Sequence, residues 1–398
     1  MSRKPRSGFD WILLSLVVGF TLFGLLMVYS AGPKFAMAIG SPPDYFLKRQ
    51  LIWAVVGMVA VFVLSLFNYH YFQRLTVLMM GLSLVALLAV AVIGDMTLGA
   101  NRSIFEGSIR PSEMAKLVAI LYVSVWLNAK RDVLNDITLG LLPLMVILGV
   151  TAGLVLIQPD ISAAFTVLIL GGILFFLAGG EWRQIGLTLA VTSLVGWVVV
   201  NVYPTGIKRI TDYISGLQNP LNASYHVQRS LEAIINGKLF GVGIAHGSTK
   251  FTGLPVAPTD SIFAVIAEET GLIGAGLVIL AYIVLLWRGL DLARRAPDSL
   301  GSLLASGITI WIVVEALLNM AVMVNLLPQA GNALPLISYG GSNLVVTLAA
   351  IGILMNISRL SEKADPSKGG GTFGAVVDLR WRDRRRRVSR FGRSSGSR

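Results

Sequence analysis

Apolar stretches of about 20 residues recur along most of this chain, and this pattern limits the possible folds more than any other feature. A helix needs about 20 apolar residues to cross the hydrocarbon core of a bilayer. Of the 398 residues, 55% are hydrophobic and only 14% are charged, whereas roughly a quarter of the residues of soluble proteins are charged. Because the charges lie mainly between the apolar stretches, we predict an all-α membrane protein.

Continuous apolar windows predict a bundle of about ten transmembrane helices. The windows fall at residues 11–31, 51–67, 75–94, 112–128, 138–157, 161–178, 184–203, 261–287, 302–324 and 343–358. Basic residues precede the first window, as in a signal peptide, but that window is longer than a signal peptide's apolar region and further spans follow it. We therefore predict an uncleaved first helix.

An even number of spans places both termini on one side of the membrane. Arginines and lysines at both ends assign that side to the cytoplasm by the positive-inside rule. We predict a multi-pass protein of the bacterial cytoplasmic membrane, with a membrane domain at residues 1–360 and a long outer loop at about 204–260, between spans 7 and 8. Within that loop, residues 225–235 are compatible with a helix.

Much of the net charge of +12 lies near the C-terminus. We predict that residues 361–398 form a disordered basic cytoplasmic tail attracted to anionic lipid, with no nucleic acid as partner. The chain has no cysteine, which excludes disulfides, thiolate metal sites and cysteine nucleophiles. Its three histidines are too far apart in sequence to predict a metal site.

Three acidic residues mark the start of the eighth span. Thr259 or Asp260 could be an ordinary helix N-cap. Glu268 and Glu269 lie deeper, where carboxylates are costly and usually face a partner or a cavity. At about 100° per residue, Glu269 faces away from Asp260, so the two do not form an obvious glycosidase-type pair. One acid would therefore act alone or with a metal.

A second group of polar residues surrounds the start of the fourth span. Glu113 and Lys116 share a helix face and can pair, which would stabilise the helix start. Alternatively, Arg102 and Lys116 hold an anion at the outer face. Between spans 5 and 6, Gln158 and Asp160 lie in a tight connection, for which a capped turn is the simplest explanation.

The last outer segment, residues 326–342, has no charge and is rich in Pro, Gly, Ser and Asn. It is typical of a re-entrant loop whose free amides could receive an anion or a sugar, although a plain loop would also fit. In the preceding span, Glu315 and Asn319 share a face and are expected to point into the bundle. A structural hydrogen bond is favoured there over catalysis.

Taken in order, these segments resemble the SEDS family of membrane glycosyltransferases, the RodA, FtsW and SpoVE kind that polymerise lipid II into peptidoglycan. The matching pieces are Lys48-Arg49-Gln50, Gly99-Ala100-Asn101-Arg102, Pro111-Ser112-Glu113 with Lys116, Gln158-Pro159-Asp160, Thr259-Asp260 with Ile262-Phe263-Ala264, Glu268-Glu269 with Gly271, and Leu334 to Ser342. Each piece alone is weak, but together, over nearly all of the membrane portion, they are highly specific.

The resemblance implies that Asp260 is the essential acid, which would deprotonate the acceptor sugar hydroxyl. It also implies a divalent cation, Mg²⁺ or Mn²⁺, with Asp260 as a possible ligand and no organic cofactor. The candidates for binding pyrophosphate or glycan are Arg49, Arg102, Lys116, Lys250, Ser338, Gly340, Gly341 and Ser342. The candidates for supporting the site are Glu113, Gln158, Asp160, Glu268 and Glu269.

The implied partners are lipid II, the nascent glycan strand, a class B penicillin-binding transpeptidase and other membrane proteins of the elongasome or divisome. The sequence departs from the family pattern around the site: Ser103, Arg110, Pro258 and Glu315 stand where Trp, Gln, His and Gln are usual. Two other functions remain open. A lipid-precursor transporter or flippase would use Glu268, Glu269 and Glu315 as ion-coupled sites, whereas an assembly scaffold would leave Asp260 as a helix cap.

Overall fold

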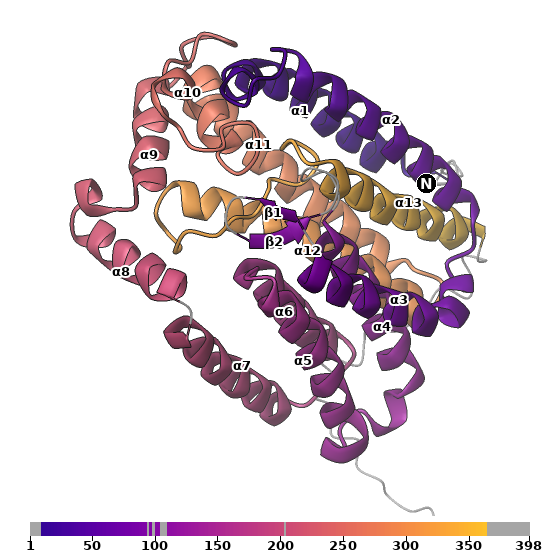
Figure 1. Ribbon diagram of the computed structural model, residues 1–398. Coiled ribbons are helices and arrows are strands. Elements are labelled where there is room, and N and C mark those ends of the chain that lie inside the picture. The colour runs from indigo at the N-terminus through magenta and orange to yellow at the C-terminus, as the bar shows by residue number, and fades with distance from the viewer. Residues whose placement is uncertain (1–8, 94, 98–99, 104–109, 203, 364–398) are drawn as a thin grey trace, which may run out of the picture.

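The computed structural model describes residues 9–363 except 94, 98–99, 104–109 and 203. The predicted basic tail from residue 364 onward lies outside the described residues. Ten helices form the bundle (Figure 1): α1 (Trp11–Ala38), α2 (Tyr45–Leu66), α3 (Tyr71–Ile93), α4 (Pro111–Ala129), α5 (Leu142–Ile157), α6 (Ile161–Leu177), α7 (Trp182–Val202), α11 (Ile262–Arg294), α12 (Ser299–Met323) and α13 (Gly341–Lys363). Each matches one predicted span.

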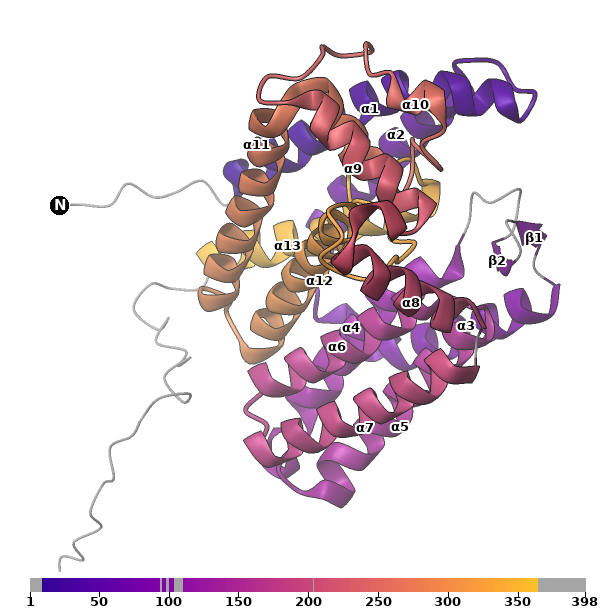
Figure 2. The same ribbon diagram turned by 90° about the vertical axis from the view of Figure 1, so that its left-hand side faces the viewer.

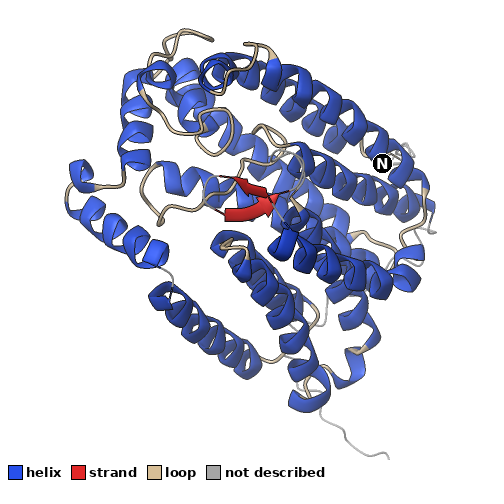
Figure 3. Ribbon diagram, viewed as in Figure 1, coloured by secondary structure: helices blue, strands red, loops and turns tan. Residues whose placement is uncertain are grey.

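Within the described part of the chain, eight helices are long and apolar enough to cross a membrane. The other two matching helices are α6, which has 17 residues, and α4, which carries Glu113 and Lys116 in its first two turns. The prediction of an all-helical polytopic membrane protein is therefore confirmed. Two short strands, β1 (Asp95–Thr97) and β2 (Ala100–Ser103), form an antiparallel hairpin that the sequence did not suggest (Figure 3).

The helices pack into a bundle with α12 and α13 at its centre, where most of their residues are buried. Helix α13 lies along α2, α12 lies along α11, and α3 lies along α4 (Figure 1). Helix α7 lies at the edge of the bundle, and only Gln184 and Thr188 of its residues are buried. An apolar helix exposed in this way is suited to contact with lipid.

The polar segments expected to form a site, as far as the structure describes them, lie at one end of the bundle, because each follows or precedes a helix on that side. We call this the site end. It carries the β1–β2 hairpin and the segment between α7 and α11, as Figure 2 shows. The predicted long loop at 204–260 is largely helical: it contains α8 (Pro204–Gln218), a 3₁₀ turn (Pro220–Asn222), α9 (Tyr225–Gly237) and α10 (Thr249–Thr252). Helix α9 confirms the predicted helix at 225–235.

At the opposite end, the connection from α4 to α5 contains two irregular helical turns. They are a 3₁₀ turn at Arg131–Val133 and a π-helical turn at Ile137–Leu141, which leads directly into α5. The carboxylate of Asp136 caps the second of these turns, accepting hydrogen bonds from the amides of Thr138 and Leu139.

Helix α11 is broken at Gly271, where φ is 71° and ψ is −175°. Such a break frees backbone groups that must find partners inside a membrane. Residues 238–243 supply them. The amides of Val242 and Gly243 donate to the carbonyls of Glu268 and Glu269, each at 3.0 Å. The amides of Leu272 and Ile273 donate to the backbone carbonyls of Lys238 and Leu239, at 2.9 and 3.2 Å. The segment between α7 and α11 is thus joined to α11 by backbone hydrogen bonds.

Candidate active site

Asp260 lies in a tight turn formed by residues 254–261, which we call the Asp260 turn. Helix α11 begins only at Ile262, and its N-cap position is occupied by Ser261, which makes no side-chain capping bond. The Thr259 hydroxyl instead donates to the Val256 carbonyl within the turn, at 3.1 Å. The interpretation of Thr259 or Asp260 as the helix cap is therefore wrong, and helix capping does not explain the carboxylate.

The charge-free segment at residues 326–340, which we call the Ser338 loop, is fixed directly onto the Asp260 turn. The Tyr339 amide donates to the Pro258 carbonyl at 2.8 Å. The Ser338 hydroxyl donates to the Thr259 carbonyl and accepts from the Leu334 amide, each at 2.7 Å. Because Ser338 lies at the centre of this contact, it holds the two segments together through its hydroxyl.

The Ser338 loop reaches into the bundle, as predicted for a re-entrant loop. Its residues Leu336 and Ile337 are buried and lie so close to Gly24 of α1 that a Cβ atom there would be 2.8 Å from their backbone. The hydroxyl of Tyr282, on α11, donates to the Pro335 carbonyl. At the end of the loop, Gly341 packs against Trp53.

Two buried amide side chains hold these segments in register. Gln50 of α2 donates to the Ser338 carbonyl at 3.1 Å and accepts from the Gly340 amide at 3.3 Å. Asn319 of α12 donates to the carbonyls of Asp260 and Asn332, at 2.8 and 2.6 Å. The structural hydrogen bond expected for Asn319 is confirmed, but its attachment to Asp260 was not foreseen. The sequence pointed to this attachment only through Asn319 itself, which is the one amide side chain in the apolar helix α12.

A cavity of about 270 Å³ lies close to Asp260, although Asp260 is not itself one of its lining residues. Gly331 lies between two residues of its lining, Ala330 and Asn332, and a Cβ atom built at Gly331 would be 3.5 Å from Asp260 Oδ2. Apolar residues of α6, α7, α8 and α12 form most of the wall: Ile161, Phe165, Val200, Ile210, Leu318 and Val322. Arg209 of α8 supplies the charge in this lining. The cavity therefore combines a cation with a largely apolar wall, and Asp260 lies close to its lining.

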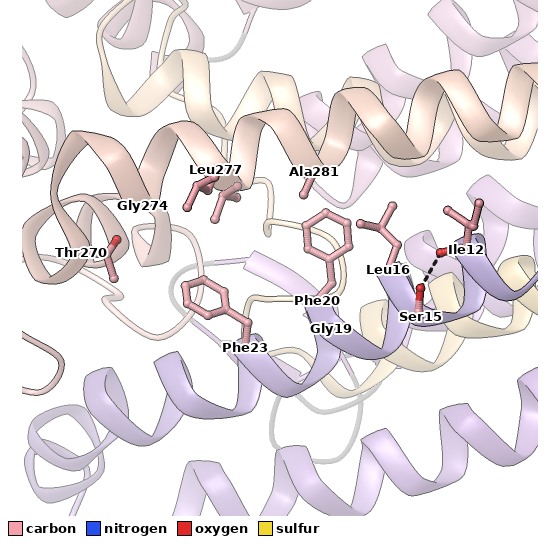
Figure 4. Close-up of a pocket in the computed structure, with 11 residues that line it drawn as sticks. Ile12, Ser15, Leu16, Gly19, Phe20, Phe23, Thr270, Gly274, Leu277 and Ala281 are labelled. Carbon is pink, nitrogen blue, oxygen red and sulfur yellow. Dashed lines mark hydrogen bonds between the residues drawn. The ribbon is translucent and has the colours of Figure 1, made fainter. Parts of the chain in front are cut away.

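A larger cavity of about 650 Å³ lies between α1 and α11. Figure 4 shows Phe20 and Phe23 of α1 facing Leu277 and Ala281 of α11 across it. Its lining contains no charged residue. Because acid-base chemistry needs a titratable group, this cavity is no candidate for the active site.

Lys116 lies inside the bundle and forms ion pairs with Glu113, at 2.9 Å, and with Glu315. The predicted pairing of Glu113 and Lys116 is therefore confirmed. The Asn343 amide also donates to Glu113, at 2.8 Å, and the Ser342 hydroxyl accepts from the Arg110 amide, at 3.1 Å. With only 4% of its side chain exposed, Lys116 holds α4 to α12, and this arrangement does not support a role in binding phosphate.

Lys250 and the two glutamates of α11 form another buried group. Lys250 pairs with Glu269 at 2.5 Å and donates to the Ser30 hydroxyl of α1 at 2.7 Å. Glu268 accepts from the amides of Ser248 and Thr249, each at 3.0 Å. These acids anchor the segment between α7 and α11 to the bundle. The structure therefore favours a structural role for them over ion-coupled transport, and a structural role for Lys250 over phosphate binding.

The remaining candidates lie around the same end of the bundle. Asp160 caps α6 by accepting from the Ala163 amide at 3.2 Å, as predicted, and accepts from the Ser112 hydroxyl at 3.4 Å. Gln158 donates to the Leu87 carbonyl at 2.7 Å. Both join neighbouring helices. Arg102 belongs to β2, but its side chain lies outside the described part of the structure.

Arg49 lies close to the Ser338 loop. Its guanidinium is 4.7 Å from the centre of the Tyr45 ring. Burial raises the pKa of Tyr339, and the adjacent Arg49 guanidinium acts in the opposite direction. Arg49 is therefore placed beside Tyr339, whose backbone amide holds the Asp260 turn.

A divalent cation at Asp260 would be held together with a substrate. Among the described residues, no group of three or more His, Cys, Asp and Glu side chains could hold a metal. Asp260 offers a single carboxylate. Mg²⁺ commonly binds through one or two carboxylates plus substrate phosphates and retains several waters. The donor set at Asp260 fits a cation of that kind.

Comparison with known proteins gives one consistent result. The model of the cell cycle protein family FtsW/RodA/SpoVE matches residues 10–363. A probable peptidoglycan glycosyltransferase FtsW from Trichlorobacter lovleyi is 38% identical over 363 residues, covering 89% of this chain and 95% of that protein.

Solved structures show the same fold. A chain from a peptidoglycan synthase complex, described in terms of the structural coordination of polymerization and crosslinking, has a TM-score of 0.72 and 26% identity, covering 89% of this chain and 98% of its own length. An aspartate-to-alanine mutant of the Thermus thermophilus rod shape determining protein RodA has a TM-score of 0.65 and 26% identity, covering 88% and 97%.

Proposed function

The chain belongs to the FtsW/RodA/SpoVE family, and from that membership we propose that it is a peptidoglycan glycosyltransferase that polymerises lipid II at the outer face of the cytoplasmic membrane. The observation that carries this proposal is the position of Asp260 beside a cavity that is apolar along most of its wall and carries Arg209. A lipid-linked pyrophosphate complements such a cavity, because it has a long apolar chain and a negatively charged group.

Asp260 acts as the general base in this proposal. Its carboxylate accepts the proton of the acceptor sugar hydroxyl, whose oxygen then bonds to the anomeric carbon of the donor as the bond to the lipid pyrophosphate breaks. A positioned base of this kind contributes about 10²–10⁴-fold to the rate. Asn319 and Ser338 support the base by fixing the backbone on either side of it.

Arg209 and Arg49 are the cations that we assign to the substrate. Arg209 lines the cavity itself, and Arg49 lies beside Tyr339 of the Ser338 loop. A guanidinium can bind phosphate oxygens through two hydrogen bonds at once. A divalent cation bound by Asp260 together with the pyrophosphate would add neutralising charge at the leaving group.

The solved peptidoglycan synthase complex supports a partnership with a crosslinking enzyme. We propose a class B transpeptidase as the partner of this chain, in cell elongation or division. The predicted orientation, with both termini in the cytoplasm, places the site end and its cavity on the outer side, where such a partner would act.

The direct test is glycan polymerisation from purified lipid II by the detergent-solubilised protein, with its transpeptidase partner present. We expect polymer from the wild-type protein, loss of polymer in excess chelator, and recovery when Mg²⁺ or Mn²⁺ is restored, because a cation would be held jointly with the pyrophosphate. Unchanged activity in chelator would remove the cation from the proposal. No polymer from folded protein with its folded partner would favour transport or scaffolding instead.

A substitution at Arg209 tests the placement of the substrate. We expect Arg209→Gln to raise the KM for lipid II about tenfold or more, since a hydrogen bond to a charged group contributes about 1.5–3 kcal/mol. Lys208→Gln is the matched control, because Lys208 is the exposed neighbour of Arg209 on α8 and does not line the cavity. Equal KM values for the two variants would contradict the assignment.

A further inference from the structure

His226 of α9 is buried, with 6% of the residue exposed, and it contacts both segments that form the candidate active site. Its Nε2 atom lies 2.5 Å from the Ser261 hydroxyl, next to Asp260 in the chain. Its Nδ1 atom lies 2.8 Å from the side-chain nitrogen of Gln329, in the Ser338 loop. The Ser261 hydroxyl is also 2.6 Å from the Pro255 carbonyl.

These contacts determine which protons the network holds. A carbonyl can only accept, so the Ser261 hydroxyl donates its proton to Pro255 and must accept from His226. The Nε2 atom therefore carries a proton. The Gln329 amide nitrogen can only donate, so Nδ1 accepts. Burial lowers the pKa of His226 to about 4, which agrees with a neutral ring. The hydrogen-bond pattern thus assigns the neutral Nε2–H tautomer.

The network joins three segments around Asp260. Ser261 is the residue that follows Asp260, and it is bonded to His226 on one side and to Pro255 on the other. Gln329 lines the same cavity as Arg209, next to Ala330 and two residues before Gly331, which lies against the Asp260 carboxylate. His226 therefore contacts both the residue next to Asp260 in the chain and the loop that lies against the Asp260 carboxylate.

We propose that His226 is a positioning residue, which sets the geometry of Asp260 by bridging Ser261 and Gln329 from the outer helix α9. This inference rests on the proposed function, because it assigns to His226 an effect on the catalytic step. Displacing a reacting group by about 1 Å can cost about 10²-fold in rate. The effect should therefore appear in kcat, while lipid II binding is largely retained.

Two substitutions separate the hydrogen bonds of His226 from its volume. His226→Phe fills similar space but can neither donate to Ser261 nor accept from Gln329. His226→Gln can do both through its amide. In the lipid II assay we expect His226→Phe to lower kcat about 10- to 100-fold with little change in KM, and His226→Gln to recover most of that loss. His246→Phe is the control, because His246 is exposed and bonds only to its own turn.

A double-mutant cycle with Gln329→Leu measures the bridge itself. If His226 and Gln329 act through one hydrogen bond, each single variant lowers kcat and the double variant is no slower than His226→Phe alone. Three results would overturn the proposal. The first is a wild-type kcat for His226→Phe, and the second is an equal loss of kcat in folded His226→Phe and folded His226→Gln. The third is additive losses of kcat in the double-mutant cycle. If His226→Phe does not fold, Gln329→Leu decides, and unchanged kcat there overturns it. Failure of the proposed function would differ, since wild type itself would then make no polymer.

Discussion

Asp260→Asn is expected to reduce kcat for glycan polymerisation by about 10²–10⁴-fold, which is the contribution of a positioned general base. Asparagine has nearly the same size as aspartate but cannot accept the hydroxyl proton. The backbone contact from Asn319 to the Asp260 carbonyl does not depend on the side chain, so the turn should stay in place. The measurement is polymer formed from purified lipid II with the transpeptidase partner present, alongside the thermal stability of each variant in detergent.

Asp212→Asn is the matched control for this experiment. Asp212 lies on α8 and belongs neither to the Asp260 turn nor to the cavity lining. We expect near-wild-type activity from it, because it removes the same charge outside the Asp260 turn and outside the cavity lining. If Asp260→Asn also polymerised lipid II at the wild-type rate, the acid would not be the base, and the scaffold function would gain support.

Gly271→Ala is expected to be the most destabilising of the substitutions discussed. The backbone of Gly271 has φ 71° and ψ −175°, a region that is essentially restricted to glycine and costs other residues about 1–3 kcal/mol. A Cβ atom there would also lie 2.3 Å from the Leu239 carbonyl oxygen and 2.4 Å from the Gly241 nitrogen. Relief of this clash would break the backbone hydrogen bonds that join residues 238–243 to α11. We expect a large fall in melting temperature in detergent and loss of polymerisation.

Gly276→Ala provides the comparison within the same helix. A Cβ atom at Gly276 would meet nothing within 4 Å, and alanine favours a helix over glycine by about 1 kcal/mol. Its melting temperature should therefore equal or exceed that of wild type. Similar melting temperatures for Gly271→Ala and wild type would show that the break in α11 tolerates a side chain, contrary to its geometry.

Features that depend on neighbouring residues in the chain could be predicted from the sequence. The Glu113–Lys116 pair follows from i, i+3 spacing. The cap at Asp160 and the helix at α9 also follow from local residue preferences. Even here the location of a helix start was uncertain, since the cap expected at Thr259 or Asp260 lies at Ser261. A compact turn moved the start of α11 toward the C-terminus.

Roles that depend on which helix faces face each other could not be predicted. Lys116 and Lys250 looked like substrate cations, but each meets a carboxylate of α12 or α11 inside the protein. Gln50 contacts a loop 288 residues further along the chain. An apolar window gives the length of a span, whereas its rotation and depth are set by packing against other helices. Spacing alone therefore cannot show which cations face a cavity.

The sequence by itself determined that the chain is a polytopic helical membrane protein, that its distinctive polar segments lie at one end, and which family it resembles. These properties follow from span length, residue order and short motifs. The tertiary structure decided that Asp260 is not a helix cap, that Arg209 rather than the buried lysines lines the nearby cavity, and that Asn319 and His226 hold the surrounding backbone. Those contacts join residues far apart in the chain, and only the packing of the helices brings them within hydrogen-bonding distance.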